Sequence, residues 1–169
     1  MAKYAITGAS GLIGSALAKA LEERGDSVLR IGRGPNKDAD IEWDPATAVL
    51  DASDLEGLDG LVHLAGESIE GRWSKGKKER ILNSRVLGTS LLADKISELD
   101  NPPKVVVSSS AIGFYGNRGD EILSENSAGG SGFLADVCKK WELEAAAIAS
   151  PKTRLVIART GIVCTPVGG

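Results

Sequence analysis

The chain has 169 residues, of which 42% are hydrophobic and 25% charged, and its formal net charge is −3. This length and composition suit one domain, or one domain and part of another, with an apolar core that needs no disulfide or metal. A mildly acidic chain lacks the electrostatic footprint of a nucleic-acid-binding protein. No apolar run approaches a membrane span, and no basic-then-apolar leader begins the chain. We therefore expect a soluble cytoplasmic protein that contacts neither nucleic acid nor membrane.

The two cysteines, Cys138 and Cys164, lie far apart in the sequence. Their spacing matches no metal-binding or redox-active motif. We expect both to be reduced packing residues, and we expect no metal site.

Between residues 3 and 14, a short apolar run changes into a helical pattern through three glycines. The run predicts a buried strand, and Gly8, Gly11 and Gly14 follow it at intervals of three. In a dinucleotide-binding turn, the first glycine makes the tight turn and the second lets the backbone approach a pyrophosphate. The third allows the helix to pack closely on the strand. The helix N-terminus adds unpaired N–H groups and the positive end of a dipole.

After these glycines, apolar residues keep helical spacing as far as Gly25, a residue type typical of helix C-termini. This order of strand, turn and helix distinguishes a dinucleotide site from an ordinary glycine-rich turn. The expected cofactor-binding residues of the turn are Thr7, Gly8, Ser10, Gly11, Leu12, Ile13 and Gly14.

A second strand, predicted at residues 27–32, ends beside Arg33. An acid at this position accepts a hydrogen bond from the ribose 2′-hydroxyl of NAD, whereas an Arg accommodates the 2′-phosphate of NADP. No Asp or Glu occurs between Val28 and Lys37. Arg33 therefore favours NADP(H) over NAD, with Ser10 and Lys37 as possible helpers. A solvated strand-end residue is the alternative interpretation of Arg33.

The rest of the chain alternates predicted strands with amphipathic segments. The further strands are expected at residues 41–43, 59–66, 104–110 and 153–164. The further helices are expected at residues 82–99 and 133–149. Such alternation indicates one α/β domain over residues 1–169. We predict a Rossmann-type, doubly wound parallel sheet with strand order 3-2-1-4-5-6.

Two predicted strands end in small or polar residues beside the glycine turn. Because ligands of α/β sheets bind at the carboxyl ends of strands, these residues are further cofactor candidates. They are Leu64, Ala65, Gly66 and Ser108. Serine hydroxyls at such an end, including that of Ser110, reach a nicotinamide or substrate or else satisfy the turn backbone. His63, the single histidine, is interpreted as a packing residue.

Several dispersed segments together resemble one family. They are residues 7–14, 63–69, 72–73, 84–85, 110–116, 141–142 and 159–163. These segments resemble the atypical extended short-chain dehydrogenase/reductases described as nucleoside-diphosphate-sugar epimerase-like, in the NAD-dependent epimerase/dehydratase superfamily. The resemblance covers essentially the whole chain.

In this family, a C-terminal substrate-binding part follows the region where the present chain ends. The resemblance therefore implies that this chain is the cofactor half, without the substrate part, and that it does not turn over substrate by itself. It implies an NADP-dependent oxidoreductase or epimerase-like enzyme in full-length form. The expected partners are a small hydroxylated substrate, for which a nucleotide sugar is one candidate, and a second copy of the chain in a homo-dimer.

Catalysis in the wider superfamily depends on a Tyr, a Lys four positions later on a helix, and a Ser or Thr at the end of the fifth strand. The resemblance places Leu134 and Cys138 at the Tyr and Lys positions, and it places Arg85, counted here as cofactor-binding, at that of an Asn. Ser110 matches the serine position and is expected to polarise the substrate oxygen. Tyr115 is the candidate proton donor. A non-enzymatic NADP-binding sensor or interaction module is the alternative.

Overall fold

The protein is described here by a computed structural model covering residues 1–34 and 39–166. Its strands are β1 (Lys3–Thr7), β2 (Ser27–Gly32), β3 (Ile41–Glu42), β4 (Gly60–His63), β5 (Val105–Ala111) and β6 (Arg154–Thr160). Its helices are α1 (Leu12–Glu23), α2 (Lys75–Ser97) and α3 (Phe133–Ala146). Two short 3-10 helices, η1 (Ala52–Leu55) and η2 (Ile112–Tyr115), lie in the connections.

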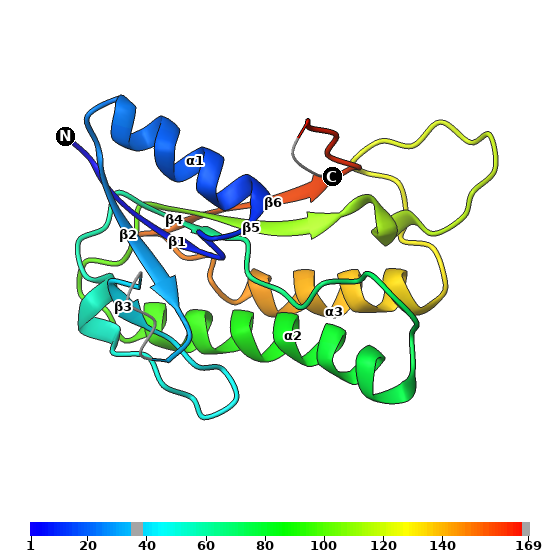
Figure 1. Ribbon diagram of the computed structural model, residues 1–169, viewed down its shortest axis with the longest axis horizontal. Coiled ribbons are helices and arrows are strands. Elements are labelled where there is room, and N and C mark those ends of the chain that lie inside the picture. The colour runs from blue at the N-terminus through cyan, green and yellow to red at the C-terminus, as the bar shows by residue number, and fades with distance from the viewer. Residues whose placement is uncertain (35–38, 167–169) are drawn as a thin grey trace.

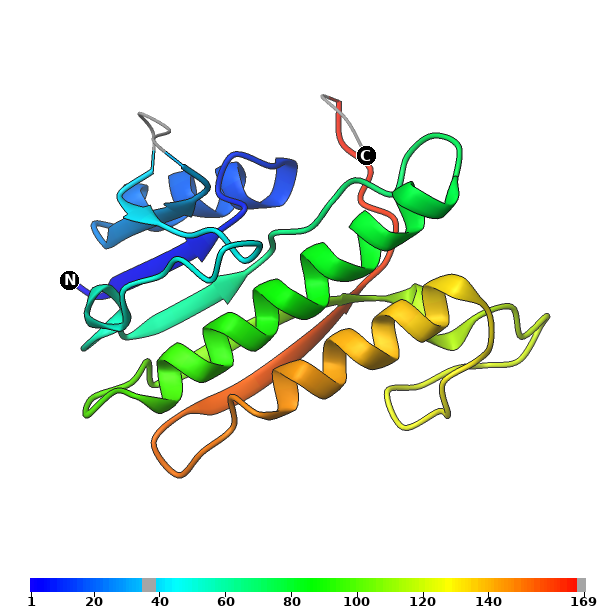
Figure 2. The same cartoon turned by 90° about the horizontal axis from the view of Figure 1, so that it is seen from below.

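The six strands form one sheet in the order β3-β2-β1-β4-β5-β6, and every neighbouring pair is parallel. Helix α1 covers one face of the sheet, and α2 and α3 lie side by side across the other (Figures 1 and 2). The predicted Rossmann-type fold and its strand order are confirmed. Because all strands run in one direction, the loops after β1, β4 and β5 meet at one edge of the sheet.

The boundaries of the elements follow local signals with several corrections. Helix α2 covers Lys75–Ser97 rather than residues 82–99, and α3 ends at Ala146 rather than at residue 149. Helix α1 ends next to Gly25, whose φ of +87° fits the predicted helix stop. Ser74 caps α2, since its Oγ accepts a hydrogen bond from the backbone N–H of Lys77 (3.3 Å). Strands β4 and β6 end at His63 and Thr160, before the apolar runs that predicted them end. The remaining apolar residues leave the sheet and form loops at its carboxyl edge.

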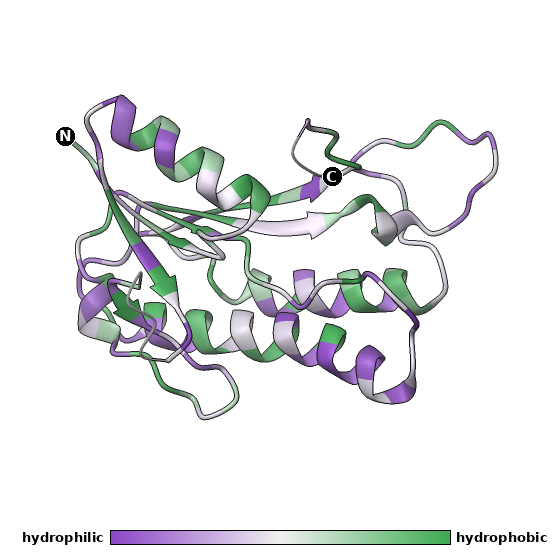
Figure 3. Ribbon diagram, viewed as in Figure 1, coloured by the Kyte–Doolittle hydropathy of each residue, from purple (hydrophilic) through white to green (hydrophobic). Residues whose placement is uncertain are grey.

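The core has two layers, one on each face of the sheet. The layer beneath α2 and α3 contains fully buried residues that include Leu61, Leu92 and Val106. The layer beneath α1 contains Ile6 and Ala18. Figure 3 shows largely apolar strands, whereas the first turns of α2, at the carboxyl edge of the sheet, are hydrophilic. The apolar layers therefore stabilise the sheet, and polar side chains are found at its carboxyl edge.

Candidate functional site: a glycine-loop cleft

The loop between β1 and α1 has the geometry that its glycines predict. Gly8 adopts a φ of +69°, in the left-handed region that favours glycine. A Cβ on Gly14 would lie 2.2 Å from the carbonyl oxygen of Gly8. Helix α1 therefore starts directly against the turn, and a side chain at position 14 would force the two apart.

The first turn of α1 is suited to an anion. Its N-cap is Gly11, so no side chain caps the helix, and no acid occurs in the first turn. The first N–H groups of a helix have no intrahelical partner, and the helix dipole adds partial positive charge there. Gly11 is exposed. A phosphate can thus approach these N–H groups without meeting a side chain at position 11.

A cleft of about 750 Å³ opens between this loop, the ends of β4 and β5, and the first half of α3. Its size is in the usual range for small-molecule sites. Among the residues that line it are these predicted cofactor residues: Gly8, Gly11, Leu12, Ile13, Gly14, Leu64, Gly66 and Arg85. Ser110, the predicted substrate contact, also belongs to the lining. The structure therefore brings most of the predicted site together in one cavity.

Other predicted cofactor residues lie outside the lining of this cleft. Ser10 and Arg33 are exposed on the surface. Ser108 is buried on the face of β5 that points away from α1. Its hydroxyl has no hydrogen-bond partner among the described residues. Lys37, named as a helper for a 2′-phosphate, lies outside the described residues. Thr7 and Ala65 do not line the cleft either, and they are joined by a hydrogen bond in the layer of residues beneath it.

Thr7 begins a buried hydrogen-bond chain beneath the cleft. Two backbone N–H groups of the loop after β4, those of Leu64 and Ala65, donate to its Oγ1 (3.1 and 3.2 Å). Its own proton therefore goes to His63 Nδ1, at 2.7 Å. His63 Nε2–H in turn donates to Thr89 Oγ1 (3.1 Å), whose hydroxyl donates to the carbonyl of residue 85 (2.7 Å). In this chain of hydrogen bonds, Nδ1 of His63 accepts and Nε2 carries the proton, which fixes the tautomer of the ring.

His63 is neutral at pH 7. It is fully buried, with the rings of Trp43 and Trp141 in edge contact at 5.9 and 6.4 Å between centroids. Burial, helped by the charge of Arg85, lowers the pKa of His63 to about 4. The residue joins β1, β4 and α2 and lies under the cleft, in line with the packing role predicted for it.

Ser110 is held by a second network, between β5, α3 and β6. Its Oγ–H donates to Glu142 Oε1 at 2.6 Å. The same carboxylate receives both edge donors of Arg159, Nε to Oε1 and Nη2 to Oε2, each at 2.8 Å. Hydrogen bonds from Arg159 and Ser110 outweigh burial and lower the pKa of Glu142, so it is ionised at pH 7. The single proton of Ser110 is thereby committed to Glu142.

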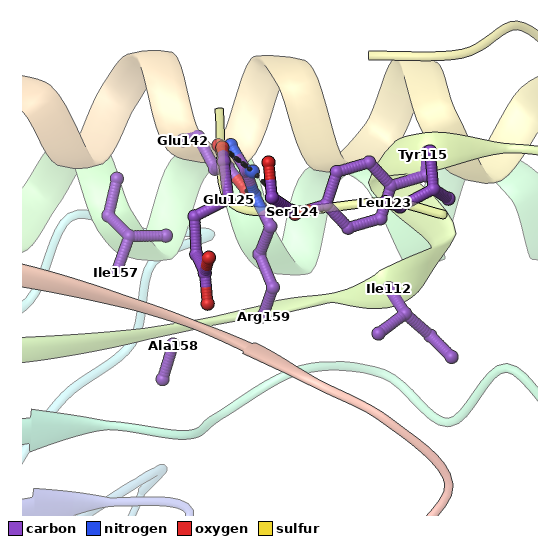
Figure 4. A pocket seen from close by; sticks show the side chains of 9 residues that line it. All are labelled: Ile112, Tyr115, Leu123, Ser124, Glu125, Glu142, Ile157, Ala158 and Arg159. Atoms are coloured by element: carbon purple, nitrogen blue, oxygen red, sulfur yellow. Dashed lines mark hydrogen bonds and ion pairs between the residues drawn. The ribbon is translucent and has the colours of Figure 1, made fainter. Parts of the chain in front are cut away.

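Tyr115 belongs to this second network as well. Arg159 Nη1 donates to its hydroxyl oxygen (2.9 Å), and the guanidinium lies over the neighbouring Phe114 ring with Cζ 3.6 Å from its centroid. Figure 4 shows Tyr115, Glu142 and Arg159 around a separate pocket of about 540 Å³. Tyr115 is buried and does not line the glycine-loop cleft.

The family model of the NAD dependent epimerase/dehydratase family matches residues 4–135. The chain belongs to this family. An epimerase family protein of Mycobacterium tuberculosis is 38% identical over 99% of the chain and 56% of its own length.

Solved structures of relatives agree with this assignment. Human epimerase family protein SDR39U1, solved with NADPH, is 33% identical with a TM-score of 0.87, over 99% of this chain and 56% of its own. MoeE5, solved with UDP-glucose and NAD, is 25% identical with a TM-score of 0.72, over 92% and 52%. The chain thus spans about half the length of these relatives. A nicotinamide dinucleotide is the cofactor type of the family.

The cleft of this epimerase-family chain fits such a cofactor. Gly8 and Gly14 leave the turn without side chains where a Cβ would meet backbone at 3.0 and 2.2 Å. The uncapped first turn of α1 offers N–H groups to a pyrophosphate. The donor set and the cavity size are therefore those of a dinucleotide site.

On α3, Leu134 and Cys138 line the cleft where the resemblance places the superfamily's Tyr and Lys. A Cβ on Gly113 would lie 3.4 Å from Leu134 Cβ and 3.8 Å from Cys138 Sγ, so both side chains pack against η2. Burial raises the pKa of the Cys138 thiol, which keeps it protonated at pH 7. Neither side chain can exchange a proton with a ligand in the way that a Tyr–Lys pair does.

Sequence reasoning missed the roles of Glu142 and Arg159, although both lie in the quoted family segments. Glu142 follows Leu134 and Cys138 at intervals of four, so it faces the same side of α3. That spacing was an available signal.

Within residues 1–34 and 39–166, no helix combines the length and apolar character that a membrane crossing requires. The same residues contain no group of acidic, His or Cys side chains arranged to hold a metal.

Proposed function

We propose that this chain is the NADP(H)-binding part of an oxidoreductase or epimerase acting on a small hydroxylated substrate, with a nucleotide sugar as one candidate. One observation carries the proposal. The N-terminus of α1 has no side-chain cap, and the glycines of the turn before it line the cleft. The NADPH of the human relative and the UDP-glucose of MoeE5 support the cofactor and the substrate class.

The residues of the chain would divide the cofactor between them. The N–H groups at the start of α1 would bind the pyrophosphate, with Gly11 leaving room for it. Arg33, exposed at the end of β2, would meet a 2′-phosphate on the ribose. Leu64 and Gly66 would border the dinucleotide beside β4. A bound nicotinamide supplies or accepts a hydride, and the protein positions and shields it.

Calorimetric titration of the chain with NADPH and with NADH tests the cofactor preference. Arg33→Ala should weaken NADPH binding about tenfold to hundredfold, since charge-assisted hydrogen bonds contribute about 1.5–3 kcal/mol, and should leave NADH binding unchanged. Arg154→Ala is the matched control, because Arg154 is an exposed arginine at the start of β6, away from the carboxyl edge. Equal affinities of the unmodified chain for NADPH and NADH would refute the role of Arg33 but not cofactor binding.

In the full-length protein, Ser110, which lines the cleft, remains the proposed substrate contact, and Tyr115, which lines the separate pocket, remains the proposed proton donor. Because Ser110 donates its proton to Glu142, its oxygen can accept a hydrogen bond from a substrate hydroxyl. Polarising a substrate carbonyl would require that the hydroxyl rotate away from Glu142. Turnover by Tyr115→Phe, measured once a substrate is known, tests the proton donor: unchanged turnover would contradict it.

A non-enzymatic sensor or interaction module is the second candidate. Two observations favour it: Leu134 and Cys138 stand at the Tyr–Lys positions, and the Ser110 hydroxyl is engaged within the protein. Incubating the NADPH-loaded full-length protein with a panel of carbonyl compounds and nucleotide sugars separates the two candidates. Oxidation of NADPH identifies an enzyme, and persistent NADPH identifies a sensor.

Assembly and location stay proposals of the same kind. We propose a cytoplasmic protein that forms a homo-dimer, and that the 169-residue chain alone does not turn over substrate, since its relatives are about twice as long. Sedimentation of the chain tests the dimer. Comparing its turnover with that of a full-length relative tests the last point.

A further inference from the structure

Arg85 of α2 reaches into the glycine-loop cleft and is held there in one orientation. Its Nη1 donates to the backbone carbonyls of Glu67 and Ile81, each at 3.0 Å. Its Cζ lies 5.1 Å from the ring centroid of Trp141. A Cβ on Gly66 would lie only 3.1 Å from the same atom. The planar guanidinium is therefore fixed by backbone and by an aromatic ring.

These contacts leave one edge of the guanidinium unused. The two bonds from Nη1 occupy both of its hydrogens. Nε and Nη2 of Arg85 have no hydrogen-bond partner within residues 1–34 and 39–166. On a guanidinium, these two nitrogens present parallel N–H groups along one edge, at a spacing that matches two oxygens of a carboxylate or phosphate.

None of the described carboxylates is hydrogen-bonded or ion-paired to this edge. Among the described residues that line the cleft, Arg85 is the one cation, and the acids are Glu67 and Glu70. The carboxylate of Glu67 pairs with Lys77 at 2.8 Å and with Arg80 at 3.5 Å. Burial lowers the pKa of Arg85, although the nearby Cys138 and Glu67 act in the opposite direction.

Arg159 shows what the same edge does when the protein fills it. Its Nε and Nη2 both bind the carboxylate of Glu142 at 2.8 Å, and hydrogen bonding to Glu142 raises its pKa. Arg85 and Arg159 thus differ in one respect that matters for ligands. The edge of Arg159 is closed by Glu142 of α3, whereas that of Arg85 has no hydrogen-bond partner among the described residues, and the Arg85 residue lines the cleft.

We propose that the Nε–Nη2 edge of Arg85 binds an oxyanion, a carboxylate or phosphate group of a small molecule that enters the cleft. The proposal rests on the proposed function insofar as a dinucleotide shares this cavity. The oxyanion has two sources, a phosphate of the cofactor itself or an anionic group of the substrate. A substrate source would make the enzyme specific for acids or phosphorylated compounds.

The Nε–H resonance of Arg85 in nitrogen-15 NMR spectra reports on this edge directly. It is assigned by its loss in Arg85→Lys, and the Nε–H resonance of Arg159 is the internal control. The chain is titrated with NADPH, then with sodium acetate or inorganic phosphate, both in the absence and in the presence of saturating NADPH. We expect a saturable shift at Arg85 and none at Arg159.

The probe that moves the resonance identifies the source. A shift with NADPH alone assigns the edge to a cofactor phosphate, and a shift with acetate or phosphate beside bound NADPH assigns it to the substrate. No saturable shift with any probe would overturn the proposal. Where acetate or phosphate binds, Arg85→Lys, which keeps the charge and loses the paired donors, should weaken binding about tenfold; unchanged affinity would equally overturn it.

The two proposals can fail separately in this experiment. Backbone amide resonances of residues 8–14 report NADPH binding at the glycine loop, independently of Arg85. If those amides do not respond to NADPH, the proposed function is wrong, while acetate and phosphate still test Arg85. If the amides respond and Arg85 responds to none of the probes, cofactor binding holds and the oxyanion proposal is wrong.

Discussion

The carboxyl edge of the sheet has two halves that treat their polar groups in opposite ways. The open half, built on the glycine loop and Arg85, leaves helix N–H groups and one guanidinium edge without a partner among the described residues. The paired half, built on Ser110, Glu142, Arg159 and Tyr115, satisfies its charged groups internally. Both halves use an arginine, yet of the two only Arg159 is hydrogen-bonded to a carboxylate.

This difference separates binding from stability. A buried or half-buried donor that stays unpaired costs free energy. When such a donor borders a cleft, a ligand that accepts its hydrogen bond removes this cost, and the gain contributes to the binding free energy. Donors that are already paired contribute to folding instead. Substitutions in the open half should therefore change ligand affinity, and substitutions in the paired half should change the free energy of unfolding.

The largest expected effect is in the open half. Gly11→Val places a branched side chain where the pyrophosphate approaches, so NADPH binding should weaken roughly a hundredfold or more, the equivalent of about two charge-assisted hydrogen bonds. The free energy of unfolding should fall by only about 1–2 kcal/mol, since the φ of −79° at Gly11 suits any residue but a Cβ there would lie 3.3 Å from the carbonyl oxygen of Gly8. Ala20→Val, on the exposed side of α1, is the control for calorimetry. Undiminished NADPH affinity of Gly11→Val would place the cofactor elsewhere.

Substitutions in the paired half should lower the free energy of unfolding. Glu142→Gln leaves Arg159 without its carboxylate in a site where the two side chains are only 12% and 20% exposed. We expect the free energy of unfolding in urea to fall by about 3 kcal/mol, with NADPH affinity unchanged. Glu144→Gln, two residues further along α3, should cost about 0.5 kcal/mol or less. A loss of NADPH affinity in Glu142→Gln without loss of stability would reverse the assignment of the two halves.

His63, beneath the open half, should make stability depend on pH. Its pKa is about 4 in the folded chain, against the ordinary histidine value of 6.5 expected once the chain unfolds, so the unfolded chain binds the proton first as pH falls. Its contribution is complete above pH 6.5 and is lost progressively towards pH 4, by roughly 3 kcal/mol in total. Urea unfolding of the chain and of His63→Gln at several pH values isolates this contribution, because the lowered carboxyl pKa values are common to both. Parallel pH profiles would contradict the buried neutral histidine.

The smallest expected effect distinguishes the two tyrosines. Tyr115→Phe removes the hydroxyl that accepts from Arg159 and should cost about 1 kcal/mol of unfolding free energy. Tyr4→Phe should cost less, since the Tyr4 hydroxyl meets Arg24 at 3.3 Å on the exposed surface. NADPH affinity should stay the same in both variants. If Tyr115→Phe instead lowered NADPH affinity at constant stability, Tyr115 would belong to the open half.

Features that depend on neighbours in the sequence were predictable. The bounds of β2, the helix stop at Gly25 and the turn at Gly8 follow from residue type and spacing over a few positions. The strand order followed from the alternation of strands and helices, because parallel strands need crossover connections. These signals also gave the glycine loop of the cleft.

The end of β6 marks where local pattern stops being sufficient. The apolar run continues to Cys164, but the strand ends at Thr160, opposite Ala111, where its partner β5 ends. A strand lasts only as long as the neighbour that pairs with it, and pairing is not written in the strand's own residues.

The roles of the site side chains were decided by tertiary structure alone. Thr7 and His63 are 56 residues apart, and Glu142 and Arg159 are 17 apart, yet each pair shares a hydrogen bond. Sequence placed Ser110 and Arg85 at the cleft, but not the carboxylate that takes the proton of Ser110, nor the edge that Arg85 leaves free. Whether a polar group is paired depends on the rotamers and distances of groups from other elements, and packing sets these only after the strands and helices have come together.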